Sequence, residues 1–248
     1  MQFLKRITIA AIIAGLAGCS PAIQEKVAET HPNGAKKKVI TFAGSESNIL
    51  ATKFYFPDGK LQSEQYFKEG KKDSVLAVFY PNGQKQRQAA YSLNQLVGKD
   101  ISWYDNGKVK SEINYINGQA EGPSITYRED GAKAAEVTYK NGKKDGEDIS
   151  YFPDGKPKTL ATYMNGELSG PSKKWYANGN LQEEVAYGNG APNGPYATYW
   201  ENGKKQEEGT NKDGNYDGTR RMWSEKGSLQ SDVTYENGQV TDGKSFVK

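Results

Sequence analysis

The sequence contains very little histidine and cysteine: His31 and Cys19 are the only residues of these types among 248. His31 stands outside the periodic part of the sequence and no second histidine or cysteine is present, so we expect no Ser/His or Cys/His nucleophile pair, no ordinary zinc site and no intrachain disulfide. Carboxylates are abundant, but they stand mostly in turn-like and alternating polar segments, where solvated surface charge explains them. We therefore expect no enzymatic activity and no cofactor.

Long apolar runs are also missing. The longest covers residues 7–16 and follows Lys5 and Arg6. Such a run is too short to span a bilayer, but it has the length and the positive flank of an export signal. We expect residues 1–18 to be a signal peptide.

The end of this run resembles the lipobox of bacterial lipoproteins. Leu16-Ala17-Gly18 precedes Cys19, and in that family cleavage occurs before the cysteine, whose thiol receives a diacylglycerol. The alternative is an ordinary signal peptide with a cysteine there by chance. Lipidation at Cys19 implies a membrane-anchored protein of the cell envelope. In the lipoprotein family, an aspartate directly after the cysteine tends to keep the protein at the inner membrane. The residue here is Ser20, so the resemblance implies the outer membrane if the cell has two membranes.

A large charge of one sign is absent as well. Loss of Lys5 and Arg6 with the signal would leave 31 basic against 30 acidic side chains. A net charge near +1 provides no field that would attract nucleic acid. Nucleic acid is therefore not an expected partner.

Glycine and tyrosine, with 28 and 16 residues, are plentiful, and the glycines lie on a grid with a step of 24. The first series is Gly59, Gly83, Gly107, Gly131, Gly155, Gly179, Gly203 and Gly227. A second series runs from Gly70 to Gly238, with Asn94 in one place, and a third from Gly98 to Gly218. Asn or Asp precedes most glycines of the first two series, as in tight hairpin turns whose central residues take positive φ. Two turns per period predict two strands per repeat.

Aromatic residues mark the strands. The residue four places before each first-series glycine is always aromatic, and these structural anchors are Tyr55, Phe79, Trp103, Tyr127, Tyr151, Trp175, Tyr199 and Trp223. The second strand of most repeats reads apolar-x-Tyr, as in Val137-Thr138-Tyr139. Alternation predicts one aromatic-aliphatic face and one polar face, and it excludes helix. The expected fold is all-β: an elongated, curved, single-layer antiparallel meander of about eight hairpin repeats.

A second set of aromatics directly follows the anchors. Alternation places them on the opposite face unless the turn has already begun, which makes them the candidate binding surface: Phe56, Tyr80, Tyr104, Phe152, Tyr176 and Trp200. Asp213, Asn215 and Asp217 resemble the first half of a calcium loop, but Gly218 lies on the third glycine series, which explains the segment without a metal. No metal site is predicted.

The repeat Tyr-x-x-Asn-Gly-Lys followed by Tyr-x-Asn-Gly-x-x-x-Gly, clear up to Gly122 in the repeat around Tyr104, where Trp103 takes the first tyrosine's place, resembles the MORN-variant repeat of YwqK-type proteins. The resemblance covers about residues 50–243. It implies a MORN-like fold, and the family's usual label implies an antitoxin of a toxin–antitoxin system. The seventh repeat departs from the pattern, because Gly209 and Asn211 replace its aliphatic residue and tyrosine.

Three segments are predicted: the signal peptide (1–18), the lipidated Cys19 with a tether and a degenerate first repeat (19–49), and the repeat array (50–248). Residues 20 to about 30 lack periodicity and are interpreted as the tether, which would include His31 near its end. A degraded ninth copy begins at Pro32-Asn33-Gly34, one residue out of phase. We expect a non-catalytic envelope lipoprotein whose repeat surface binds a protein partner. The alternatives are an antitoxin or immunity-type inhibitor and a module that binds glycans or lipids.

Overall fold

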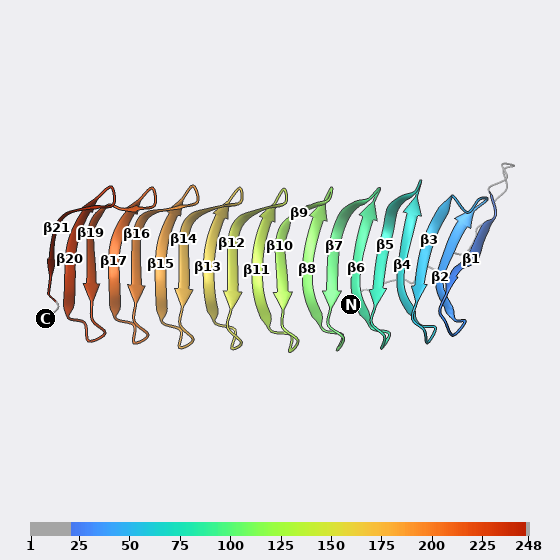
Figure 1. The fold of residues 1–248 in the computed structure, drawn as a ribbon, viewed down its shortest axis with the longest axis horizontal. Coiled ribbons are helices and arrows are strands. Elements are labelled where there is room, and N and C mark those ends of the chain that lie inside the picture. The colour runs from blue at the N-terminus through green and yellow to red at the C-terminus, as the bar shows by residue number, and fades with distance from the viewer. Residues whose placement is uncertain (1–20, 247–248) are drawn as a thin grey trace, which may run out of the picture.

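The computed structural model describes residues 21–246, and in this range the chain forms strands and turns without any helix. The strands lie side by side in chain order in a single open layer (Figure 1). The predicted fold class, an elongated antiparallel meander of hairpins, is confirmed. The predicted signal peptide and Cys19 lie outside the described residues. No helix capable of crossing a membrane occurs within residues 21–246.

The sheet has 21 strands. The first ten are β1 (Ile23–Thr30), β2 (Lys36–Ala43), β3 (Ile49–Tyr55), β4 (Leu61–Lys68), β5 (Lys71–Phe79), β6 (Lys85–Ser92), β7 (Gln95–Trp103), β8 (Val109–Ile116), β9 (Gln119–Ala120) and β10 (Gly122–Tyr127). The others are β11 (Lys133–Lys140), β12 (Lys143–Tyr151), β13 (Pro157–Met164), β14 (Glu167–Trp175), β15 (Leu181–Gly188), β16 (Ala191–Tyr199), β17 (Lys205–Lys212), β18 (Asn215–Tyr216), β19 (Gly218–Trp223), β20 (Leu229–Glu236) and β21 (Gln239–Ser245). β9 with β10, and β18 with β19, are the two halves of one interrupted strand, since both halves pair with the same preceding neighbour.

The second-series turns are two-residue hairpin turns with both central residues at positive φ. Asn117 and Gly118, for example, have φ values of 49° and 79°. This backbone is the type I′ turn, whose twist matches that of the strands it joins. Leu93 and Asn94 replace Asn-Gly in one repeat, and they too take positive φ values, of 48° and 74°. The turn therefore imposes this backbone even on a leucine.

The first-series turns are built differently from the expectation. Only their glycines have positive φ, and Gly59 N–H donates to the Phe56 carbonyl at 2.9 Å while Phe56 N–H donates to the Lys60 carbonyl at 2.8 Å. This is a type I turn closed by a glycine bulge, and Pro57 occupies its second position, where proline is favoured. The bulge adds one residue to the second strand, so Phe54 faces Ser63 while Tyr55 faces Leu61.

The third-series glycines lie inside the first strand of each repeat, at a bulge. Gly146 has φ of 116°, and a Cβ atom placed on it would lie 3.1 Å from the Cβ of Thr138 on β11. Other residues rarely adopt this backbone, so glycine is needed for conformation as well as for space. Between Val137 and Tyr139 the pairing partner moves from Asp148 to Lys144, which is the signature of the bulge.

The tether predicted for residues 20 to about 30 is wrong for most of its length, because Ile23–Thr30 forms β1 and pairs with β2. Its side chains are all exposed and show no alternation of burial, which explains why the strand left no pattern in the sequence. The predicted ninth copy is present: Gly34 N–H donates to the His31 carbonyl at 2.9 Å, as in the first-series turns. His31 therefore belongs to a turn.

Both terminal strands are one residue out of the internal register. β1 has a second register shift, between Val27 and Glu29, beyond the usual bulge beside its turn. In β21 the bulge contains one extra residue, because Thr234 of β20 pairs with Asp242 and the next residue, Tyr235, pairs with Val240. The corresponding bulge of an internal repeat contains two extra residues, since Val137 pairs with Asp148 and Tyr139 with Lys144. The lysine run of residues 36–38 lies in β2, one strand inside the N-terminal edge strand β1.

Few side chains are deeply buried in this single layer. Among the described residues, no large side chain falls below 2% exposure. Most ring and aliphatic side chains of the strands are half-buried against neighbours on the same face. Stability therefore comes from cross-strand pairs that each contribute on the order of 0.2–1 kcal/mol, added along the array.

Candidate interaction surface

The aromatic residues occupy both faces of the sheet. Asp148 and Ser150 of β12 lie opposite Ala161 and Thr159 of β13, so these residues share one face, and Tyr151, which follows Ser150, points to the other. We call the face that carries the apolar-x-Tyr residues of the second strands the tyrosine face, and the face that carries the eight aromatic anchors the anchor face. The expectation of one aromatic face and one polar face is wrong, since each face carries rings.

The tyrosine face is the more sheltered of the two. From β4 onward, the buried side chains all belong to it by register: Gln65, Ala89, Asp100, Ala120, Tyr196 and Asn211. The sheet thus uses this face as its own core.

Two arginine–carboxylate ion pairs lie on the tyrosine face at equivalent repeat positions, with the acid and the base exchanged between them. Arg87 donates to Asp100 through Nε at 3.0 Å and Nη2 at 2.6 Å. Five repeats further on, Arg220 Nε donates to Glu207 at 2.7 Å, with the acid and base exchanged. The hydrogen bond to Asp100 raises the pKa of Arg87. Partial burial alone would raise the pKa of Glu207, but its hydrogen bonds to Arg220 and Tyr196 outweigh burial and lower it.

The seventh repeat has fewer large side chains on the tyrosine face, as its sequence predicts, and the rings of two neighbouring tyrosines fill the space. Tyr196 of β16 lies opposite Gly209, and its ring carbon Cε1 is 2.7 Å from where a Cβ on that glycine would be. Its hydroxyl donates to Glu207 at 2.6 Å. Tyr216 faces Asn211, and its ring centroid lies 5.8 Å from that of Tyr196. Both departures from the repeat pattern therefore have a compensating tyrosine.

The anchor face carries a continuous row of side chains that crosses the whole sheet. In order of pairing the row is Lys53, Glu64, Ala77, Gln88, Ile101, Glu112, Ile125, Glu136, Ile149, Leu160, Lys173, Glu184, Ala197, Glu208, Arg221, Asp232 and Lys244. Its middle, from Ile101 to Leu160, is mainly aliphatic. The two glutamates within this stretch are paired, Glu112 with Lys99 at 3.3 Å and Glu136 with Lys133 at 2.6 Å.

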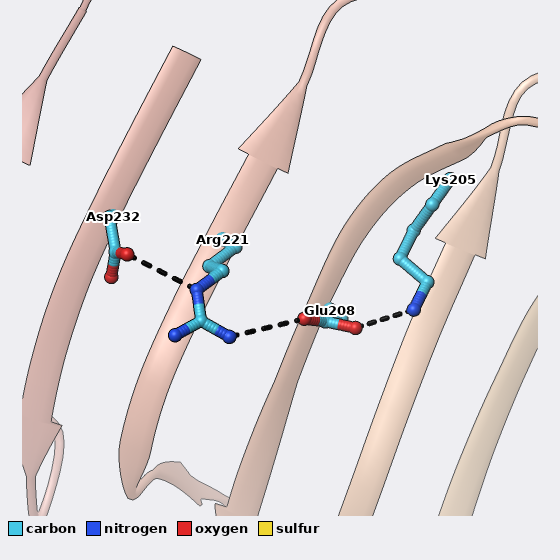
Figure 2. A network of polar contacts seen from close by, with 4 residues as sticks. All are labelled: Lys205, Glu208, Arg221 and Asp232. Atoms are coloured by element: carbon cyan, nitrogen blue, oxygen red, sulfur yellow. Dashed lines mark hydrogen bonds and ion pairs between the residues drawn. The ribbon is translucent and has the colours of Figure 1, made fainter. Parts of the chain in front are cut away.

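Charge dominates the C-terminal part of this row. Glu208 contacts Lys205 at 2.5 Å and Arg221 at 3.5 Å, and Arg221 Nε contacts Asp232 at 3.1 Å (Figure 2). The hydrogen bond from Lys205 is the main cause of the lowered pKa of Glu208. All four side chains are partly open to solvent, so the network positions charge at the surface and adds little to stability.

An open hollow of about 640 Å³ lies beside this network, over β14 to β19. Small residues make its floor, among them Ala186, Ala197 and Gly209. Ala197 occupies the row position at which Ile101, Ile125 and Ile149 stand in other repeats, so the missing side-chain volume explains the depression. Glu184, Lys205, Glu208 and Arg221 line it with charge.

The six aromatics selected as candidate binding residues lie at the first position of the first-series turns, so the alternation of the strand has ended before them. None is exposed; all are half-buried. The four that are not phenylalanine connect consecutive repeats through a polar side-chain atom: the hydroxyl of Tyr104 donates to the Tyr127 carbonyl at 2.7 Å, and Trp200 Nε1 donates to the Trp223 carbonyl at 3.2 Å. Tyr80 and Tyr176 make the same bond, as do Arg128 and, one residue out of phase, His31.

Where it carries a donor, this corner position therefore holds one repeat to the next, a structural contribution that sequence analysis missed. A signal for it exists in the sequence: Tyr, Trp, Arg and His recur at one repeat position and share an N–H or O–H donor at the end of a long side chain. Whether these residues also contact a partner remains a prediction.

The corner bond predicts opposite effects for two matched substitutions. Tyr104→Phe removes the hydroxyl and should lower the free energy of unfolding by about 0.5–1.5 kcal/mol, since a half-buried carbonyl loses its donor. Phe152→Tyr places a hydroxyl at the equivalent corner, toward the Trp175 carbonyl, and should raise it by a similar amount. Urea unfolding of both variants tests this; changes of the same sign would contradict it.

The suggested calcium residues have other partners. Asp217 accepts a hydrogen bond from the backbone N–H of Asn237 at 3.4 Å, and Asp213 lies within a type I′ turn. The equivalent Asp145 and Glu121 receive the N–H groups of Asn165 and Asn141 in the same way. In the part of the chain that the structure describes, no group of three or more potential ligands is placed to hold a metal.

Comparison with known proteins gives a family match over parts of the chain. The family model of the MORN repeat variant matches residues 51–69, 96–117, 168–189, 192–213 and 216–237. Four of the five matches begin in the same phase of the 24-residue period, and the hairpins between them have the same structure. A search of curated proteins gives no match.

Two solved structures align weakly. The crystal structure of TcdB2-TccC3 aligns with 90% of this chain at 11% identity and a TM-score of 0.22. The crystal structure of TcdB2-TccC3-Cdc42 aligns with 86% at 11% identity and a TM-score of 0.18. The alignments span 18% and 17% of those chains, and their TM-scores are below the level that indicates a shared fold.

Proposed function

Starting from the premise that this chain carries MORN-variant repeats, we propose that it is a non-catalytic envelope lipoprotein that binds protein partners through its anchor face. The observation that carries the proposal is the row from Ile101 to Leu160. It is mainly aliphatic, only half-buried, and without a second layer of the described chain above it.

The composition of this face supports a protein partner. Interfaces between proteins combine an apolar centre with aromatic residues and arginine, surrounded by a charged rim. Here the anchors Trp103, Tyr127 and Tyr151 flank the aliphatic centre, and the network of Arg221 lies at its C-terminal side. The side chains of Lys85 and Lys133 lie over the rings of Trp103 and Tyr151, at 5.8 and 5.9 Å from the ring centroids, and protect them from water in the absence of a partner.

Attachment to the membrane is proposed through a lipid on Cys19. The segment signature around this residue supports it, and the short distance along the chain to β1, which begins at Ile23, would hold the N-terminal end of the sheet close to the bilayer. Replacing Cys19 by serine should move the protein from the membrane fraction to the soluble fraction, with no incorporation of labelled fatty acid. A membrane-bound Cys19→Ser protein would contradict the lipid anchor alone.

Photo-crosslinking in the intact envelope tests partner binding. A photoreactive residue at position 149, in the centre of the anchor face, should give a discrete adduct with another protein. The same residue at position 240, an exposed site on the tyrosine face of β21, serves as the control. No protein adduct, or adducts with polysaccharide only, would overturn the proposal. Identification of the adduct as a toxin would make the protein an immunity-type inhibitor.

A further inference from the structure

We infer that the anchor face binds a second copy of this chain, face to face and with the long axes antiparallel. This inference rests on the proposed function, since it names one partner of the same face.

The first argument is the absence of a second layer. Sheets in folded domains normally cover their apolar face with another sheet or with helices. Here the tyrosine face shelters its own side chains, whereas the anchor face leaves Ile101, Ile125, Ile149 and Leu160 half-open in one line. A second sheet packed at the usual separation of about 10 Å would cover them.

The second argument is area. The aliphatic stretch crosses six adjacent strand rows, from β7 to β13, which at about 4.8 Å per row is about 29 Å. With strands about 20 Å long, each copy would contribute about 600 Å² of surface, or about 1,200 Å² for a symmetric pair. This total lies at the lower end of the range for specific interfaces, so a concentration-dependent dimer is expected.

The third argument is that the row is compatible with its own reversal. A twofold axis parallel to the strands, between β10 and β11, places Ile101 of one copy over Leu160 of the other and Gln88 over Lys173. In the centre it places Ile125 over Glu136 and Glu112 over Ile149. Glu112 and Glu136 remain paired with their own lysines, so no isolated carboxylate is covered.

The fourth argument is the distribution of charge along the molecule, which selects the antiparallel alignment. Residues 21–72 carry nine lysines and six carboxylates, whereas residues 181–246 carry seven basic and eleven acidic side chains. An antiparallel pair brings the positive end of each copy beside the negative end of the other, whereas a parallel pair brings like ends together.

Sedimentation velocity over a wide range of concentration tests association. The chain from residue 19 with Cys19→Ser retains every strand and should shift from monomer to dimer as its concentration rises. Ile149→Lys and Ile125→Lys should each weaken association about 30-fold or more, because each new ammonium would be buried over Glu112 or Glu136 of the other copy, whose charge its own lysine already neutralises. Val240→Lys, on the other face, should leave it unchanged. Melting curves of each variant show whether it is folded.

Crosslinking tests the alignment. Chains with Gln88→Cys and chains with Lys173→Cys, mixed in the cysteine-free background and treated with a short bifunctional maleimide, should crosslink with each other and hardly with themselves. Crosslinks within the Gln88→Cys population alone would overturn the antiparallel arrangement. A wild-type chain that stays monomeric, or a dimer insensitive to both lysine substitutions, would overturn the dimer. If photo-crosslinking at position 149 still captures another protein in that case, the proposed function stands without the dimer.

Discussion

Replacing Gly209 by valine should lower the free energy of unfolding by about 3 kcal/mol, although it restores the aliphatic residue found in most other repeats. The cause is Tyr196, whose ring lies where the new side chain would be, 2.7 Å from the Cβ position. Overpacking of this kind costs about 1–3 kcal/mol, and displacing the ring also breaks the hydroxyl's bond to Glu207.

A second substitution should reverse this loss. In other repeats the residue opposite the aliphatic position is small: Ser124 faces Val137, and Ser172 faces Val185. Tyr196→Ser combined with Gly209→Val recreates this pair, so the double variant should be more stable than either single variant. Urea unfolding of all four chains gives the coupling between the two sites, expected to be about 1–3 kcal/mol and favourable. Additive losses would show that the ring does not fill the space of Gly209.

Arg220→Ala and Arg221→Ala should differ strongly in effect, although the residues are adjacent in the chain. Arg220 lies on the tyrosine face with its side chain 25% exposed, against Glu207 at 16% exposure. Its removal leaves a mostly buried carboxylate without its cation, at a cost of roughly 2 kcal/mol, which is below the value for full burial. Arg221 lies on the opposite, open face, and its loss should have little measurable effect. Equal losses from thermal unfolding would contradict this assignment of faces.

The loss caused by Arg220→Ala should also depend on pH. The pKa of Glu207 in the folded chain lies below its ordinary value of 4.5. The stabilisation from its ionised form is therefore fully present above about pH 4.5 and disappears as the pH falls through the lowered pKa. The difference in stability between wild type and Arg220→Ala should shrink in acid. A difference that stays constant from neutral pH to about pH 3 would exclude Glu207 as the cause.

The glycine grid predicts the hairpins because each glycine acts locally. Positive φ at Gly118 and Gly142 is a property of the turn itself, and a fixed period repeats it without reference to the rest of the fold. The number and order of internal strands follow directly. β1 was missed because all of its side chains are exposed, so burial imposes no alternation on its sequence.

The assignment of faces needed the structure. Alternation within one strand is visible in the sequence, but the relation between two strands depends on the residue that the bulge inserts beside each first-series turn. A difference of one residue reverses every side chain of the second strand. This is why Tyr151 and Tyr163, both predicted for one aromatic face, lie on opposite sides.

Long-range compensation was also beyond the sequence pattern. Tyr196 stands where four other repeats have serine or aspartate, and Gly209 where most have an aliphatic residue, yet only the register shows that the two are directly opposite. The contact that Tyr104 and its equivalents make with the next repeat was not foreseen either, because it depends on where the strand ends and the turn begins.

The register shifts in the terminal strands β1 and β21 affect how the protein can associate end to end at high concentration. An open sheet exposes unpaired backbone groups at each end, and identical units invite stacking into fibres. A neighbour docking on β1 or β21 in the internal register would bring its apolar side chains against the wrong side or leave hydrogen bonds unmade. End-to-end polymerisation through β1 and β21 is therefore disfavoured even at high local concentration.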